Sequence, residues 1–168
     1  PYAALDKVLE AYVDVHGPEV GVVLAAFPPA PGDAVAAVVV PSSDPHLSEY
    51  LPERWQGREW LSGFTGSVGT LVVTEDFAGV WVDSRYWTQA EGQLAGTGIE
   101  LMKISGAGSS AHLDWLAEHI APGARVAVDG AVLGLSGARA LQSALSERGI
   151  ELRTDLDVLN DVWDDRAA

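Results

Sequence analysis

The sequence predicts an α/β domain with a mixed β-sheet of about six strands and helices on both faces of the sheet. Short apolar runs follow one another through the middle of the chain, which is typical of neighbouring strands. In the second half, apolar runs alternate with segments that carry apolar residues at helical spacing. The length of 168 residues suits one domain with its own core, so we expect a single domain over 1–168.

The first third of the chain predicts one helix, two strands and a loop. Residues 5–15 place apolar side chains at helical spacing and predict an amphipathic helix. The runs 20–27 and 34–40 are apolar on both faces, so they predict strands near the centre of a covered sheet. The proline-rich segment 41–55 predicts an ordered loop with at most a short helix.

The remaining elements follow from periodicity and turn residues. Residues 69–74 and 79–83 predict a hairpin, because a short turn joins two apolar runs. Beyond it the sequence predicts alternating helices and strands, namely a helix at 88–94, a strand at 99–104, a helix at 110–120, a strand at 124–129, a helix at 136–149 and a strand at 150–154. In the last helix Ser136 is the expected N-cap and Gly149 the stop.

Charge and composition exclude several classes of function. The chain has 10 Lys and Arg against 24 Asp and Glu, a net charge of −14, which opposes binding to nucleic acid or to anionic lipid. It has no cysteine, which excludes disulfides, cysteine-zinc sites and thiol nucleophiles. The longest apolar stretches are too short to span a membrane, and the first residues lack the pattern of a signal peptide. We therefore expect a cytoplasmic protein.

Two glycine-rich segments are candidate nucleotide sites. Residues 63–69 lack a phosphate-binding lysine and lead into a strand, so a tight turn between close backbone segments is the favoured interpretation. The segment "GAGSSA", Gly106 to Ala111, lies between a predicted strand and helix, and Asp129 ends the next strand. This pattern keeps a dinucleotide-binding domain open as an alternative, although too little chain follows Asp129 for a complete dinucleotide fold.

Three further polar patterns favour structural roles. Ser136 lies in "GLSGA", which lacks the last glycine of a nucleophile elbow, so we expect only the helix cap. His112 and His119 are seven residues apart rather than four, so we expect surface histidines and no metal pair. The aspartates of 155–165 lack the spacing of a calcium loop and predict the solvated face of a helix.

Arg85 is the most informative charged residue in the sequence. It stands between a predicted strand and a predicted helix, where a positive charge opposes the helix dipole. Either Asp83 neutralises this arginine or an anion from outside the chain binds it. The loop that contains His46, Glu49 and Tyr50 is the most polar and aromatic one in the chain, and such loops often face a site.

Five segments in a fixed order carry a resemblance to a known family. They read "VPSSDPHLSEY", "WLSGFTGSVGTLVVT", "VWVDSRYWTQAEGQL", "LMK" and "LNDVWDDR". Over residues 36–166 the chain resembles the N-terminal domain of the Xaa-Pro aminopeptidases, which belong to the creatinase/prolidase group of metallopeptidases, and it is most similar to their long, multidomain branch. The resemblance implies a fold of the creatinase/prolidase N-terminal type with a ribonuclease H-like motif.

The resemblance also implies that catalysis takes place in a different domain of the enzyme. In that family a C-terminal domain holds two divalent metal ions, manganese or zinc, that activate water for peptide cleavage. The present chain corresponds to the first domain only. The resemblance therefore implies that this chain has no catalytic residue, no metal and no cofactor, and that it should not hydrolyse peptides on its own. The family implies a peptide with proline at the second position as substrate, contacts with the protein's own C-terminal domains, and a homodimer of the intact enzyme.

The resemblance places the substrate contact on Arg85. The arginine of "DSRYW" is expected to reach the active site of the assembled enzyme and to hold a peptide carboxylate or carbonyl with two hydrogen bonds. His46 and Tyr86 match the same segments and are expected to support this contact. A free-standing protein-interaction module remains the other alternative to an aminopeptidase domain. Two departures from the family pattern are the longer proline-rich stretch before residue 40 and Ser84 in place of a frequent glycine.

Overall fold

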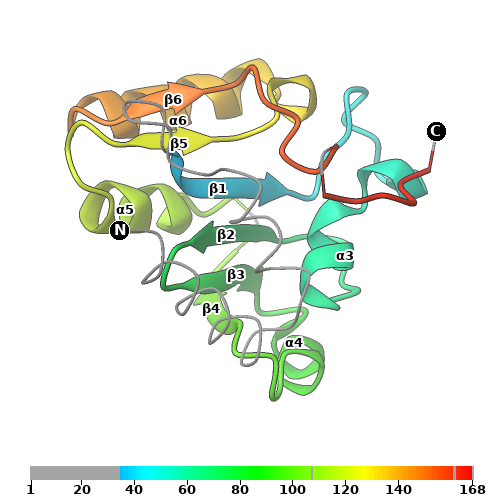
Figure 1. Cartoon of the computed structure of the whole chain (residues 1–168). Coiled ribbons are helices and arrows are strands. Elements are labelled where there is room, and N and C mark those ends of the chain that lie inside the picture. The colour runs from blue at the N-terminus through cyan, green and yellow to red at the C-terminus, as the bar shows by residue number, and fades with distance from the viewer. Residues whose placement is uncertain (1–34, 107, 161, 168) are drawn as a thin grey trace, which may run out of the picture.

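Six strands form one mixed sheet in the computed structural model, which describes residues 35–106, 108–160 and 162–167. The strand order is β4-β3-β2-β1-β5-β6 (Figure 1). The strands are β1 (Val35–Pro41), β2 (Thr70–Thr74), β3 (Ala78–Asp83), β4 (Glu100–Ile104), β5 (Arg125–Ala127) and β6 (Glu151–Arg153). β2 is antiparallel to both β1 and β3, and the other pairs are parallel. The carboxyl ends of β1, β3, β4, β5 and β6 therefore lie at one edge of the sheet.

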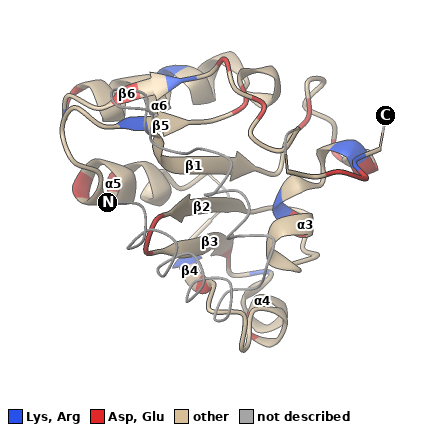
Figure 2. Cartoon of the chain, viewed as in Figure 1, with Lys and Arg blue, Asp and Glu red and all other residues tan. Residues whose placement is uncertain are grey.

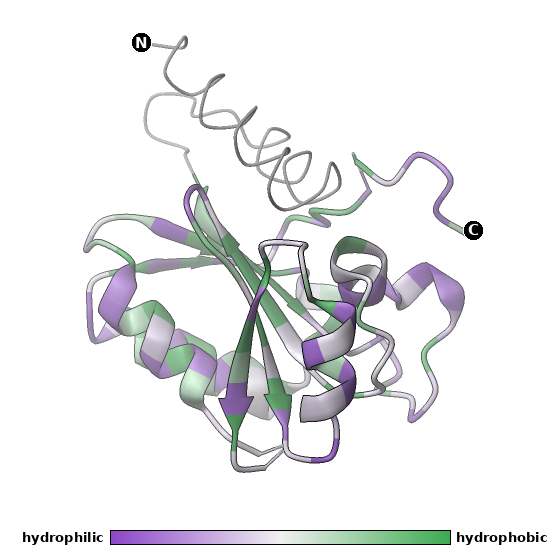
Figure 3. Ribbon diagram, turned by 90° about the horizontal axis from the view of Figure 1, so that it is seen from below, coloured by the Kyte–Doolittle hydropathy of each residue, from purple (hydrophilic) through white to green (hydrophobic). Residues whose placement is uncertain are grey.

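Helices cover the two faces of the sheet, as the apolar pattern predicts. The α-helices are α3 (Gly57–Ser62), α4 (Trp87–Gln93), α5 (Ala111–His119) and α6 (Leu135–Ser146), and two 3-10 turns are η1 (Glu53–Trp55) and η2 (Gly130–Val132). α5 and α6 pack on one face through Leu116 and Leu145, which are fully buried. α3 and α4 pack on the other face through Leu61 and Ala90. Figure 3 shows the strands largely hydrophobic and the helices of mixed character.

The structure confirms the predicted α/β class and most of the predicted elements. The hairpin of β2 and β3 is present, and β1 lies inside the sheet, with residues 37–40 buried and its ends half-buried. Leu113, Leu116 and Ile120 point into the core from α5, as their spacing predicts. The predicted helix at 5–15 and the predicted strand at 20–27 lie outside the described residues.

Two predictions near the carboxyl end of the chain are wrong. Ser136 is not the N-cap of α6, because the helix starts one residue earlier and Gly134 is its cap, accepting a hydrogen bond from Ala138 N. The described residues of 155–165 form turns rather than a helix. Val158, Leu159 and Trp163 are buried nevertheless, and Leu159 packs on Gly57 so closely that a β-carbon at that glycine would clash with it.

The prediction that both histidines of α5 lie on the surface holds for His119 only. His112 is half-buried, and its ring lies 6.5 Å from that of Trp81, with an interplanar angle of 64°. Burial lowers the pKa of His112 below its usual value, while the nearby Asp114 charge acts in the opposite direction. His119 is exposed and stacks on Trp115.

We expect His112 to make the fold less stable in mild acid. Its folded-state pKa is below the unfolded value of about 6.5, so the unfolded chain binds more protons and the free energy of unfolding falls as the pH falls through about 6.5. Urea unfolding between about pH 5 and pH 7 should show this slope and a shallower one for His112→Gln. His119→Gln is the matched control on the same helix and should keep the slope; equal slopes for His112→Gln and the parent chain would contradict the assignment.

Candidate functional site

The polar loops of the chain meet at the sheet edge where β1 and β3 end. β1 leads into the loop 42–52, the segment 63–69 leads into β2, and β3 leads through Arg85 and Tyr86 into α4. α3 lies at the same end of the sheet (Figure 1). In open α/β sheets, ligands bind outside the carboxyl ends of the strands. This edge is therefore the candidate site.

A buried arginine from α3 holds two of these loops together. The Arg58 residue is 4% exposed; its Nε donates to Ser42 Oγ at 2.7 Å and its Nη1 to Phe64 O at 2.6 Å. Its Nη2 donates to Gly66 O, and its Cζ lies 4.7 Å from the centre of the Phe64 ring. Burial lowers the pKa of Arg58 to about 10, so the group stays charged at neutral pH. No carboxylate hydrogen-bonds to it within the described part of the chain.

A cleft of about 250 Å³ lies over Arg58. One wall comes from the loop after β1 and includes Glu49 and Tyr50, and the other includes Thr65 and Ser67 of the glycine segment. Trp55 and Glu59 also line it. The volume is below the roughly 300 Å³ at which small-molecule pockets usually begin, so the cleft fits part of a ligand rather than enclosing one.

The glycine segment has the structural role that its sequence predicts. Gly66 lies against the ring of Phe64, which a β-carbon at Gly66 would overlap, and its carbonyl accepts the Arg58 hydrogen bond. Thr65 donates its backbone N–H to Gln93 Oε1 of α4 at 3.0 Å. The glycines thus allow the tight turn between α3 and β2, and Thr65 of this turn contacts α4.

Asp44 shapes the loop on the other side of the cleft. It is fully buried, and its Oδ1 accepts hydrogen bonds from the backbone N–H groups of His46 at 3.0 Å and Ser48 at 2.9 Å. The Ser48 amide contributes most to holding the pKa of Asp44 below its usual value, although burial acts in the opposite direction. Leu47 adopts φ 54°, a left-handed conformation that costs energy for a leucine.

Arg85 and Tyr86 lie beside the cleft wall that Ser67 forms. Tyr86 Oη and Ser67 Oγ are 2.5 Å apart, and the Arg85 Cζ lies 5.3 Å from the centre of the Tyr86 ring. Arg85 also pairs with Asp83 at 2.8 Å, so the neutralising contact considered in the sequence is present. The Arg85 side chain is still 60% exposed.

The structure brings two of the three predicted substrate residues together. Arg85 and Tyr86 are in contact, whereas His46 is exposed in the loop after β1 and does not line the cleft. The sequence did not single out Arg58. Its segment, "WQGREW", is half polar, so no local pattern distinguishes this arginine from an exposed one.

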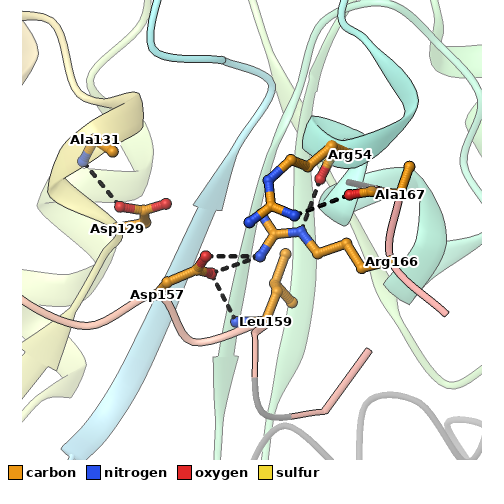
Figure 4. Close-up of polar contacts among 7 residues, drawn as sticks. All are labelled: Arg54, Asp129, Ala131, Asp157, Leu159, Arg166 and Ala167. Atoms are coloured by element: carbon orange, nitrogen blue, oxygen red, sulfur yellow. Dashed lines mark hydrogen bonds and ion pairs between the residues drawn. The ribbon is translucent and has the colours of Figure 1, made fainter. Parts of the chain in front are cut away.

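A second polar cluster fixes the last described residues against the fold (Figure 4). The side chain of Arg166 is 5% exposed; its Nη1 donates to both carboxylate oxygens of Asp157, at 2.8 and 2.7 Å, and its Nε donates to Arg54 O at 2.9 Å. Arg54 Nη1 in turn donates to Ala167 O at 2.8 Å. A cavity of about 30 Å³ beside Asp157 and Arg166 has room for about one water molecule.

Asp129 belongs to this cluster and not to a nucleotide site. Its Oδ1 accepts a hydrogen bond from Ala131 N at 2.8 Å and so caps η2. Burial, and then the charge of Asp157, raise the pKa of Asp129, while the Ala131 amide lowers it. The central antiparallel β2 also differs from the parallel dinucleotide-binding sheet. The alternative based on Gly106 to Ala111 therefore has no support in the described residues.

The described part of the chain contains neither a group of metal-binding side chains nor a helix that could span a membrane. No group of three or more His, Cys, Asp or Glu side chains there could hold a metal ion. No helix there is long and apolar enough to cross a membrane. Acidic side chains are distributed over helices, turns and loops rather than gathered on one element (Figure 2).

We expect Arg58→Met to destabilise the fold. The change leaves Phe64 O and Gly66 O without their buried donor, which should cost about 2–4 kcal/mol of unfolding free energy. Chemical denaturation should measure this loss, with Arg139→Met, on the exposed side of α6, as the matched control. A loss below about 0.5 kcal/mol, the range of an ordinary surface change, would show that the buried hydrogen bonds are not needed.

The chain is similar in sequence to known proteins. A model of the family described as Creatinase/Prolidase N-terminal domain matches residues 32–159. Aminopeptidase P2 of Arabidopsis thaliana is 37% identical over 137 residues, which are 80% of this chain and 19% of that protein. Xaa-Pro aminopeptidase 2 of Homo sapiens is 43% identical over 101 residues, which are 60% of this chain and 14% of that protein. The chain thus spans less than a quarter of these curated relatives.

Solved structures give the same result for the fold. The X-prolyl aminopeptidase of Caenorhabditis elegans, described as a cytosolic enzyme with a di-nuclear active site, matches 98% of this chain and 26% of its own, with a TM-score of 0.75 and 27% identity. The N-terminal domain of the cytoplasmic peptidase PepQ from Mycobacterium tuberculosis H37Rv matches 95% of this chain and 98% of its own, with a TM-score of 0.57 and 23% identity. The second likeness concerns the fold alone.

Proposed function

Because the chain belongs to the Creatinase/Prolidase N-terminal domain family, we propose that it is the non-catalytic N-terminal domain of a metal-dependent Xaa-Pro aminopeptidase. The observation that carries this proposal is the pattern of coverage. Relatives named as aminopeptidases match most of this chain, while this chain matches only 19% of Aminopeptidase P2. The reaction would release the N-terminal residue of a peptide that has proline in second position. It would take place in a further domain of the same protein.

The proposed role of this domain is to bind part of the peptide substrate. Arg85 offers an exposed guanidinium at the end of β3, and Tyr86 lies between it and the cleft. Glu49 and Glu59 line the cleft and suit a positively charged group such as a peptide α-amino group. His46 lies in the loop that carries Glu49 and is proposed to contact the substrate from there.

The metal ions are assigned to the part of the protein outside this chain. No group of described residues fits a metal centre. We propose that two divalent ions, manganese or zinc, are held by the catalytic domain, in keeping with the di-nuclear active site named for the C. elegans relative. A cytoplasmic location and a homodimeric intact enzyme complete the proposal, with this domain contributing to contacts between domains and subunits.

The reading frame of the gene distinguishes the proposed aminopeptidase domain from a free-standing interaction module. A free-standing interaction module requires a reading frame that stops after Ala168, whereas an aminopeptidase requires a catalytic domain encoded beyond it. A stop codon at that point would contradict the proposed function directly.

In the full-length protein we expect Arg85→Ala to weaken substrate use. Loss of charge-assisted hydrogen bonds should lower kcat/KM for an Xaa-Pro peptide roughly ten- to a hundredfold, mainly through a higher KM. Arg139→Ala, which removes an exposed arginine on α6, is the matched control and should change neither constant. Unchanged kcat and KM for Arg85→Ala would remove Arg85 from the substrate site.

A further inference from the structure

Aromatic and polar contacts hold residues 162–167 against the rest of the domain. Trp163 is 8% exposed and donates its backbone N–H to Leu159 O at 3.0 Å. Its ring stacks on the ring of Trp60 from α3, with the ring centres 4.9 Å apart and an interplanar angle of 13°. This contact joins a segment near the carboxyl end of the chain to the helix that carries Arg58.

Arg166 makes a second contact with the same part of the fold (Figure 4). Its Cζ lies 5.2 Å from the centre of the Trp55 ring and 5.8 Å from the centre of the Trp163 ring. Asp157 accepts hydrogen bonds from Nη1 with both carboxylate oxygens, so the buried charge of Arg166 is paired. Without Asp157 a buried cation would lack its partner, which is costly.

Arg54 and Arg166 exchange hydrogen bonds in two directions. Arg166 Nε donates to Arg54 O at 2.9 Å, and Arg54 Nη1 donates to Ala167 O at 2.8 Å. These bonds run in opposite directions between η1 and residues 166–167, so they fix the orientation of this segment as well as its position. Arg54, Asp157, Trp163 and Arg166 together form the Arg166 cluster.

The η1 turn that holds this cluster also forms part of the cleft. Trp55 lines both the cleft over Arg58 and the small cavity beside Arg166. Gln56 Nε2 donates to Leu51 O at 3.0 Å, which attaches the same segment to the loop after β1. α3 begins at the next residue, and its Arg58 joins the two walls of the cleft. Residues 53–60 therefore contact both the cleft and the last described residues of the chain.

We propose that Arg54 and Arg166 are positioning residues that set the orientation of the domain after this one relative to the cleft. This inference rests on the proposed function, which assigns catalysis to a further domain. Domains move relative to one another by default unless their contacts prevent it, and the Arg166 cluster fixes the direction in which the chain leaves this domain. Neither arginine lines the cleft, so both would act through the geometry between domains.

The first test uses the 168-residue chain and does not depend on a catalytic domain. Arg166→Met removes the pair with Asp157 and the hydrogen bond to Arg54 O. The backbone N–H groups of Trp163 and Arg166 should then exchange with deuterium roughly tenfold faster, whereas those of β2 should change less. Arg148→Met, which changes an exposed arginine, is the matched control. Unchanged exchange over residues 162–167 in Arg166→Met would overturn the inference.

The second test uses the full-length protein. Because this chain has no cysteine, Arg139→Cys gives it a single site for a spin label, to be paired with a label on the catalytic domain. Arg54→Met and Arg166→Met should broaden the distribution of distances between the labels. They should also lower kcat/KM for an Xaa-Pro peptide roughly tenfold, since a misplacement of about 1 Å can slow a reaction about a hundredfold. Arg148→Met should change neither quantity.

The distance measurement separates a positioning role from a merely structural one. A distribution that stays narrow in Arg166→Met would overturn the inference even if the activity falls, because the domains would have kept their orientation. Absence of Xaa-Pro peptidase activity in the parent protein would instead contradict the proposed function. If Arg166→Met does not fold, Arg54→Met keeps the pair of Asp157 with Arg166 and decides the question by the same measurements.

Discussion

The arrangement of the candidate site depends on one buried cation, Arg58. Its guanidinium has no carboxylate partner in the described residues and donates hydrogen bonds to Ser42 Oγ, Phe64 O and Gly66 O. Burying a charge is costly unless its hydrogen bonds are made, so those oxygens must converge for the fold to form. This requirement joins the loop after β1 to the glycine segment before β2. The position of both walls of the cleft follows from it.

The glycine segment that Arg58 holds also contacts the residues after β3. Ser67 follows Gly66 directly and contacts the hydroxyl of Tyr86, whose ring lies beside Arg85. The parallel course of β1 and β3 brings their carboxyl ends to the same edge, so loops distant in sequence become neighbours. Asp83 in turn holds Arg85 by hydrogen bonds to its backbone N–H and to its side chain. Arg58, Tyr86 and Arg85 are therefore each held by a partner within the chain.

The parts of the fold that depend on local patterns were predictable, and those that depend on distant partners were not. The apolar runs of β1, β2 and β3 and the spacing of apolar residues on α5 predict those elements correctly. The local pattern of apolar residues indicates which faces of an element are buried. The short helix α3 was missed because six residues are too few to show a helical period. The helix expected near 155–165 is absent because Asp157 bonds Arg166, nine positions away, and Leu159 packs on Gly57. For the site, sequence could point to Arg85 and Asp83 as neighbours, but not to the buried partners of Arg58.

The two arginines of this edge, Arg58 and Arg85, differ in burial and in hydrogen-bond partners. Arg58 is buried and donates hydrogen bonds to backbone carbonyls, so its guanidinium holds the loops in place. Arg85 is 60% exposed and has only one edge occupied, because Asp83 binds it side-on and leaves its far end in solvent. A wholly unpaired arginine there would be a general anion site on a chain that is otherwise acidic. Pairing with Asp83 neutralises the Arg85 charge and leaves the rest of its guanidinium exposed.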